Sequence, residues 1–253
     1  MNQLHIGLLS LFLYLAYLLF QRFRAGGPFR YSKDSGLSQE QIRALALSAS
    51  VSLRNELQLN TLALGRRGKK IAHHYLSEWE VSSAEEVRKL LEKRLSAQTS
   101  SYMPLIYAAF NLEGKDQAGF LYRASERNQG LNDLLLELTN NLTATYPGLE
   151  SRGIVSSRAD IMRYGLVGWD TRHACMIARA AYEIGYLSER DAWDYINRAQ
   201  RMARKAFTSW HDFAMSCLIS NAVFTGDHFN SDHRAVKKLL KEKHSPWLKY
   251  GWE

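Results

Sequence analysis

The residues around position 170 are the strongest candidates for chemistry in this sequence. The candidate site consists of Trp169, Asp170, Arg172, His173, Arg179, Trp193 and Trp210. A carboxylate paired with an arginine or a histidine in a buried pocket has a perturbed pKa, which is typical of groups that transfer protons. Tryptophans around such a pair would enclose a small anionic ligand. In the structural alternative, Asp170 or Thr171 caps a helix by accepting hydrogen bonds from its free backbone amides.

A second group has side chains that can bind metal ions. Asp227 and His228 are followed by Asp232 and His233, and carboxylates and imidazoles bind divalent cations. The glycine, asparagine and serine in the same stretch instead indicate a polar loop and a helix start. The chain also lacks the HExxH, Walker, GxGxxG and GxSxG motifs. We therefore expect no metal site and no cofactor, and the sequence assigns no catalytic residue.

The two cysteines are predicted to be structural. Cys175 and Cys217 each lie in an apolar stretch with helical spacing, and no CxxC motif is present. Buried cysteines of this kind behave as small apolar side chains in a reducing compartment. Free thiols are the prediction, and a disulfide between the two is the alternative.

A basic helix face is the remaining candidate for binding. It comprises Asn197, Arg198, Arg201, Arg204 and Lys205. Such a face is either solvated or contacts an anionic partner or phosphate. Residues 71–253 carry 23 basic and 22 acidic side chains, and this near-neutral balance argues against a nucleic-acid partner.

The N-terminal segment has the composition of a membrane anchor. Residues 6–20 are almost entirely apolar, and residues 1–20 contain no Lys, Arg, Asp or Glu. With Leu4 and His5 the run is at the short end of what spans a bilayer. We expect an uncleaved anchor, with a cleaved signal peptide or a buried core helix as alternatives. No basic residue precedes the run and four follow it by position 33, so the positive-inside rule places the C-terminal domain in the cytoplasm of a bacterial inner membrane.

Most of the net charge of +8 belongs to the segment after this run. Residues 21–70 carry ten basic and three acidic side chains. The side chains predicted to contact anionic lipid head groups are Arg22, Arg24, Arg66, Arg67, Lys69 and Lys70. For the 66–70 cluster the alternative is a solvated loop.

The rest of the chain is predicted to be all α-helical. We divide the whole chain into an anchor (1–21), a juxtamembrane linker (22–37) and a multi-helix globular bundle (38–253). Helix-start signals occur at Ser38, at Ser82 or Ser83, at Ser188 and at Ser209, each followed three residues later by Gln, Glu or Asp. Gly185 is expected to end the helix that contains Arg179, which we place on its outer side, and 146–148 are expected to form a turn.

Residues 168–224 resemble the signature of a bacterial family known as domain of unknown function 1266. The residues that carry the resemblance are Trp169-Asp170, Ala178-Arg179, Tyr182, Gly185-Tyr186-Leu187-Ser188, Ala192-Trp193, Phe207 and Ser209-Trp210. Trp79 with Ser82 resembles the family's early element, and Ser245-Pro246-Trp247 its C-terminal element. His173 stands where the family pattern has an arginine. The resemblance implies a mostly helical bacterial domain and no particular activity.

Two functions fit these observations. The first is a membrane-anchored interaction or regulatory module that binds the lipid bilayer and a protein partner, using exposed tryptophans and the basic helix face. The second is an enzyme or small-anion-binding domain with its site around Asp170, His173, Trp193 and Trp210. Convergence of Asp170, Arg179 and Trp210 on a concave pocket would favour the second, whereas dry packing of the same residues would favour the first.

Overall fold

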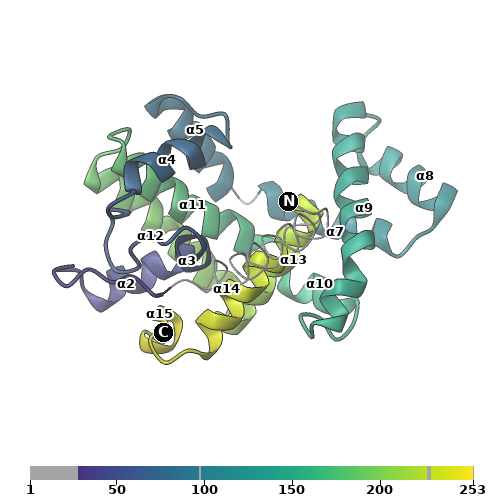
Figure 1. Cartoon of the computed structure of the whole chain (residues 1–253). Coiled ribbons are helices and arrows are strands. Elements are labelled where there is room, and N and C mark those ends of the chain that lie inside the picture. The colour runs from purple at the N-terminus through teal and green to yellow at the C-terminus, as the bar shows by residue number, and fades with distance from the viewer. Residues whose placement is uncertain (1–27, 97, 227–228, 253) are drawn as a thin grey trace, which may run out of the picture.

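A computed structural model of the chain describes residues 28–96, 98–226 and 229–252. These residues form an all-helical, multi-helix globular domain, and their only β pairing is an isolated bridge between Arg30 and Gln58 (Figure 1). The elements are α2 Gln39–Leu45, η1 Ala46–Ser48, α3 Ala49–Arg54, α4 Gly68–Ser77, α5 Ala84–Leu95, α6 Gln98–Ser101, α7 Met103–Phe110, α8 Gly114–Ala124, α9 Gln129–Ser151, α10 Ala159–Tyr164, α11 Val167–Glu183, α12 Glu189–Ala206, α13 Trp210–Thr225, α14 Phe229–Lys241 and α15 Pro246–Lys249.

Serine caps begin α2, α5, α12 and α13, as the sequence predicts. Ser38 and Gln41 form a reciprocal capping box at α2. At α5 the cap is Ser83, whose hydroxyl accepts a hydrogen bond from the Glu86 amide. The same hydrogen bond to the third helical residue is made by Ser188 at α12 and by Ser209 at α13. Each cap joins a serine to the backbone amide three residues later, so the local sequence is sufficient to predict it.

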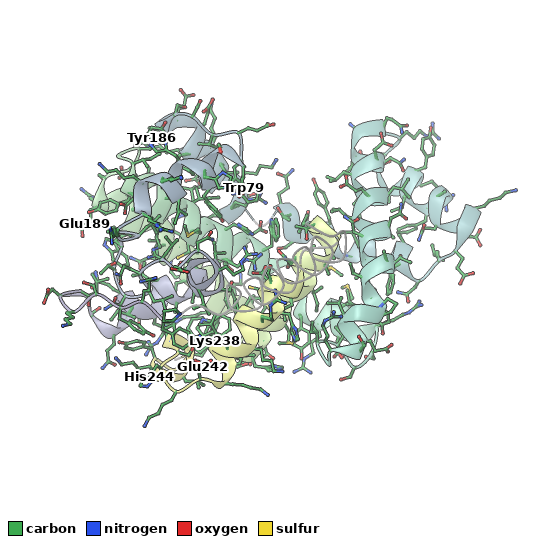
Figure 2. The ribbon with its side chains drawn as sticks, viewed as in Figure 1. Trp79, Tyr186, Glu189, Lys238, Glu242 and His244 are labelled. Carbon is green, nitrogen blue, oxygen red and sulfur yellow. The ribbon has the colours of Figure 1, made fainter. Side chains whose placement is uncertain are left out.

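Helix α11 forms the centre of the larger part of the domain. Its residues from Gly168 to Ala181 are all buried, because α4, α5, α12 and α13 pack around it. Gly185 takes a positive φ of 83° directly after the helix and ends it as predicted. At that end the Tyr186 hydroxyl donates a 2.6 Å hydrogen bond to the Ser82 carbonyl, tying α11 to the start of α5 (Figure 2).

The start of α11 differs from the prediction, because neither Asp170 nor Thr171 caps it. The helix begins earlier, at Val167, and no side chain caps it at the preceding residue. The free amide of Gly168 instead donates a 3.0 Å hydrogen bond to the Ser216 hydroxyl on α13. A Cβ at Gly168 would lie 2.8 Å from the Cys217 amide nitrogen, so only glycine permits this close approach. A tertiary contact therefore replaces the local cap.

The predicted turn at 146–148 is wrong. Helix α9 continues through Pro147 to Ser151 and packs against α7 and α13 on one side of the domain (Figure 1). Proline inside a helix costs about 3 kcal/mol because it removes a hydrogen bond and clashes with the preceding turn. Here the proline is exposed, and Leu142 and Leu149 on either side of it are fully buried. Burial of these leucines offsets the cost and keeps the helix in one piece.

The proposed anchor, residues 1–21, lies outside the described residues. Within the described part of the chain, no helix combines the length and the apolar character that crossing a membrane requires. The second half of the predicted linker is described. Phe29, Tyr31 and Leu37 in it pack against the common hydrophobic core.

Candidate functional site

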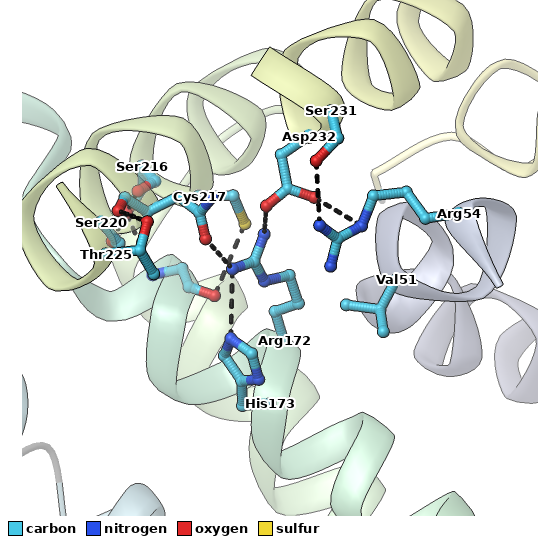
Figure 3. Close-up of polar contacts among 12 residues, drawn as sticks. Val51, Arg54, Arg172, His173, Ser216, Cys217, Ser220, Thr225, Ser231 and Asp232 are labelled. Carbon is cyan, nitrogen blue, oxygen red and sulfur yellow. Dashed lines mark hydrogen bonds and ion pairs between the residues drawn. The ribbon is translucent and has the colours of Figure 1, made fainter. Parts of the chain in front are cut away.

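The N-terminal half of α11 carries a buried network of charged side chains. Arg172 is 1% exposed and its Nη1 lies 2.9 Å from Oδ2 of Asp232, which is itself fully buried at the start of α14 (Figure 3). The other oxygen of Asp232 lies 3.0 Å from Nε of Arg54 on α3. Asn221 on α13 accepts a 3.1 Å hydrogen bond from Arg172. Four helices are thus joined through one carboxylate and two guanidinium groups.

The surroundings of Arg172 keep it charged. Burial disfavours the charged form of Arg172, but the nearby Asp232 together with Cys217 and Tyr75 outweighs this effect, and the pKa of Arg172 is raised. Breaking such a pair strands the remaining charge in the interior. The pair therefore stabilises the junction of α3, α11, α13 and α14 only as long as both members are present.

His173 extends the network toward an aromatic cluster. Burial, followed by the charge of Arg172, holds the pKa of His173 well below its usual range, so the ring is neutral. Arg172 lies 3.1 Å from Nε2, and because a guanidinium only donates, Nε2 is the acceptor. Nδ1 then carries the hydrogen and donates to the Tyr75 hydroxyl at 2.6 Å. The Trp169 and Trp79 rings pack against the imidazole with centroids 4.2 and 5.1 Å away.

Asp170 is the most chemically unusual residue of the candidate site. Its side chain is fully buried, and burial raises its pKa to about 6, while the neighbouring Arg94 offsets only part of this rise. Oδ1 lies 3.5 Å from Nη1 of Arg94, and Oδ2 accepts a 3.2 Å hydrogen bond from Ser100. The Arg94 guanidinium in turn stacks over the Trp79 ring at 4.5 Å. A carboxyl group with this pKa is half protonated near pH 6 and could exchange a proton close to neutral pH.

Arg179 lies two turns further along α11 and is not on the outer side as predicted. It is fully buried and donates five hydrogen bonds, to the Ser48 and Ser52 hydroxyls and to the carbonyls of Gln58, Thr61 and Leu62. All of these acceptors are neutral. Burial lowers the pKa of Arg179 to about 10, which leaves it charged at physiological pH. Its role is to hold the 57–64 loop against α11.

The two remaining candidate tryptophans lie elsewhere. Trp210 stacks on Trp247 with centroids 5.3 Å apart and meets Trp252 edge-on at 4.6 Å. Trp193, half-buried on α12, has no ring contact or hydrogen bond with other residues that the structure describes. Asp170, Arg179 and Trp210 are therefore parts of three separate contacts, each packed within the domain, and they do not converge on one pocket.

Sequence reasoning missed several members of the network. The residues that only the structure brings to Asp170, Arg172 and His173 are Arg54, Tyr75, Arg94, Ser100 and Asn221. Asp232 was considered only as a metal ligand, beside Asp227 and His228, which lie outside the described residues. Arg54 and Arg94 lie in the last turns of α3 and α5, and no pattern in the sequence indicates that these two cations are partly buried.

The predicted surface residues are exposed where the structure describes them. Arg66 and Arg67 precede α4, while Lys69 and Lys70 belong to its first turn and not to a loop. Arg22 and Arg24 lie outside the described residues. On the basic face of α12, Arg198 forms a bidentate pair with Glu92, and Arg204 lies 3.0 Å from Glu40. Much of that face is therefore neutralised within the domain.

Two further sequence predictions concern side-chain state and exposure. Cys175 and Cys217 are both free and buried, as predicted. Burial raises the pKa of the Cys217 thiol to about 12, so it is no nucleophile. The prediction of exposed tryptophans is wrong, because each tryptophan among the described residues is at least partly buried.

Comparison with known proteins identifies the family. The profile of the family described as "Protein of unknown function (DUF1266)" matches residues 76–252, which is more than half of the chain. No curated protein and no solved structure matches the sequence. The matched region contains α11, α13 and α14 and with them most of the buried network. The chain belongs to the DUF1266 family of proteins of unknown function.

Proposed function

We propose that this protein is a membrane-anchored helical module that acts by binding a protein partner. The observation that carries the proposal is the state of its charged candidate residues. Arg172, Asp232 and Arg179 are buried, and each makes ion pairs or hydrogen bonds within the domain, although Nε of Arg172 has no hydrogen-bond partner among the described residues. Such residues determine shape and stability, and a module that acts by presenting a rigid surface needs nothing more from them.

The anchor is inferred from the sequence. Residues 4–20 are apolar and uncharged except for the histidine at position 5, and basic residues follow them on one side only. This pattern supports a single span in a bacterial inner membrane with the helical domain in the cytoplasm. The module would then meet its partner at the cytoplasmic face of that membrane.

The anchor is tested by extraction of whole-cell membranes with alkaline carbonate. The full chain should stay in the membrane pellet, and Leu11→Arg with Leu15→Arg should move it to the soluble fraction, because each arginine in a bilayer centre costs about 3 kcal/mol. A matched double variant, Lys115→Arg with Lys89→Arg on the exposed helices α8 and α5, is the control. Extraction of the unchanged chain would refute the anchor, and a reporter after Glu253 that is active only in the periplasm would refute the orientation.

The interaction role is tested by affinity capture of the full chain from native membranes in a mild detergent. We expect one protein to be retained in stoichiometric amount and to be lost when the domain is unfolded with urea before the capture. Capture of the chain alone, with no protein retained under any mild condition, would count against the proposal.

A second function is favoured by one specific observation at Asp170. This carboxyl group has a pKa of about 6, its Oδ1 has no hydrogen-bond partner among the described residues, and Arg94 beside it is only partly buried. Such a group fits acid–base chemistry on, or binding of, a small anion that reaches Arg94 and Trp79. A melting-temperature screen against small carboxylates and phosphates tests it. Stabilisation that disappears in Arg94→Met would support this function, and no stabilisation by any compound would reject it.

A further inference from the structure

An edge formed by α14 and α15 carries an excess of basic side chains. Residues 229–250 contain six lysines and arginines against Asp232 and Glu242. Asp232 is buried and pairs with Arg172 and Arg54, and Glu242 pairs with Lys238 at 3.7 Å. Among the described residues, the remaining basic side chains of this edge have no acidic partner.

The helical period gathers these charges on one side. Arg234, Lys237 and Lys241 are exposed and follow each other at intervals of three and four residues, which places them in one stripe. The opposite side of α14, with Ala235, Val236 and Leu239, is fully buried against α3 and α13. Burial of the apolar side of α14 therefore keeps its basic side facing the solvent.

An exposed apolar side chain lies at the end of the same edge. Lys243 and Lys249 extend the basic stripe, and Leu248 between them is 52% exposed, although its neighbour Trp247 is buried. Lysines around a protruding leucine are typical of surfaces that rest on a bilayer, with the charges at the head groups and the apolar side chain between them.

The described part of the chain begins beside this edge. The Phe29 ring lies 5.0 Å from Nζ of Lys238, and the Tyr31 hydroxyl donates a 2.6 Å hydrogen bond to the carbonyl of His244. Lys238, Glu242 and His244 follow the lower edge of the domain in Figure 2, away from Tyr186. Only seven residues separate Phe20 from Pro28, and a fully extended stretch of that length spans at most about 25 Å.

We propose that the α14–α15 edge is the surface by which the domain lies on an anionic phospholipid bilayer. The proposal rests on the membrane anchor proposed above and adds which face the anchor brings to the lipid. Each basic side chain close to an anionic leaflet strengthens attachment about fivefold. The Arg22 and Arg24 side chains next to the apolar run would add to the same contact.

The test uses the full chain reconstituted in vesicles of phosphatidylcholine alone or with about one third phosphatidylglycerol. A fluorescent probe is attached at Lys241→Cys, since Cys175 and Cys217 are buried and unreactive in the folded domain. Lipids with a nitroxide head group should quench this probe several-fold more in the anionic vesicles than in the neutral ones, and high salt should reverse the difference. A probe at Lys115→Cys on α8 is the control and should show no such difference.

A charge-reversal pair tests the same edge without a probe on it. Lys237→Glu with Lys243→Glu should reduce quenching of the 241 probe in anionic vesicles at least fivefold, whereas Lys115→Glu with Arg123→Glu, an equal change of charge on α8, should leave it unaltered. Equal quenching of the 241 probe in both kinds of vesicle, or none, overturns this inference alone if the chain floats with the vesicles. A chain that floats with neither vesicle overturns the anchor and this inference together.

Discussion

The two ends of α11 each bury an arginine, but they stabilise it in different ways. Near the N-terminal end, Arg172 is paired with the carboxylate of Asp232, and it lies beside Asp170 and His173, whose pKa values are strongly shifted. Two turns later, Arg179 has no carboxylate within hydrogen-bonding distance and is held by two hydroxyls and three backbone carbonyls.

This difference separates a region that responds to pH from one that does not. In the Arg172 region the energy of each charge depends on the protonation of its neighbours, so the stability of this region depends on pH. In the Arg179 region the acceptors cannot titrate, and the five donors of the guanidinium match five oxygens. If this domain has a regulated or reactive part, the first region is where it must lie.

The largest effect is expected when Asp232 is removed. Asp232→Ala strands Arg172 in the interior and should lower the free energy of unfolding by about 3–5 kcal/mol. Urea unfolding followed by tryptophan fluorescence, in a nonionic detergent, measures it. Asp194→Ala removes an exposed carboxylate 3.9 Å from Arg198 and is the matched control, with an expected loss below about 0.5 kcal/mol. Equal losses for the two variants would show that the network does not stabilise the domain.

Removal of Arg179 should cost less and should act locally. Arg179→Met keeps the apolar stem but leaves five acceptors unsatisfied, while it also removes the cost of burying a cation. We expect a loss of about 3 kcal/mol that does not change between pH 5 and pH 8. Hydrogen exchange should accelerate first in the 57–64 loop. Unchanged exchange there would mean that the loop is held by its other contacts.

Asp170 should give the clearest pH dependence. Its pKa is about 6 in the folded domain, against about 3.9 when unfolded. Because the folded pKa is the higher one, the folded state binds the proton more tightly. Its contribution to stability is fully present below about pH 4 and is lost as the pH rises through 6.

Asp170→Asn should remove this dependence. The shift of about two pH units corresponds to at most about 3 kcal/mol, and an amide fits the site less well than a protonated carboxyl group, so we expect the variant to be about 2 kcal/mol more stable than the unchanged domain at pH 8. His173 has a lowered pKa and acts in the opposite sense on acidification, so the difference between variant and unchanged domain isolates Asp170. A variant less stable at pH 8 would show that the negative charge is needed to balance Arg94.

The smallest effect is expected at a surface pair that serves as the reference for both buried regions. Glu92 accepts two hydrogen bonds from Arg198, at 2.7 and 2.6 Å, but both side chains are substantially exposed. Glu92→Gln should cost less than about 1 kcal/mol, and less again in high salt. Thermal melting at two salt concentrations checks this. A cost comparable to that of Asp232→Ala would contradict the distinction between buried and exposed pairs.

The helix starts show what could be predicted without the structure. Ser38, Ser188 and Ser209 cap as expected because a cap is made by residues three apart in the chain. The same logic failed at Asp170, because the free amides of α11 are satisfied by Ser216 from another helix. It also failed at Pro147, where packing of α9 outweighs a local preference.

The candidate site was predicted only in part for the same reason. The sequence indicates that the run from Trp169 to His173 is unusual, yet the residues that contact it and set its electrostatics come from six other helices, α3, α4, α5, α6, α13 and α14. The basic side of α14 also escaped notice, because the charge count of the whole C-terminal part is near neutral. A charge count averaged over a long segment does not show that basic side chains three and four residues apart gather on one side of a helix.

The sequence by itself therefore determined the all-helical class, the starts of α2, α5, α12 and α13, the buried free cysteines and the family. Each of these depends on neighbouring residues or on the order of residue types along the chain. Only the tertiary structure decided that Arg172 pairs with Asp232, that Arg179 clamps a loop and that the pKa of Asp170 rises. These properties depend on burial and on contacts between residues far apart in the chain, such as Arg172 with Asp232 and Arg179 with Ser48.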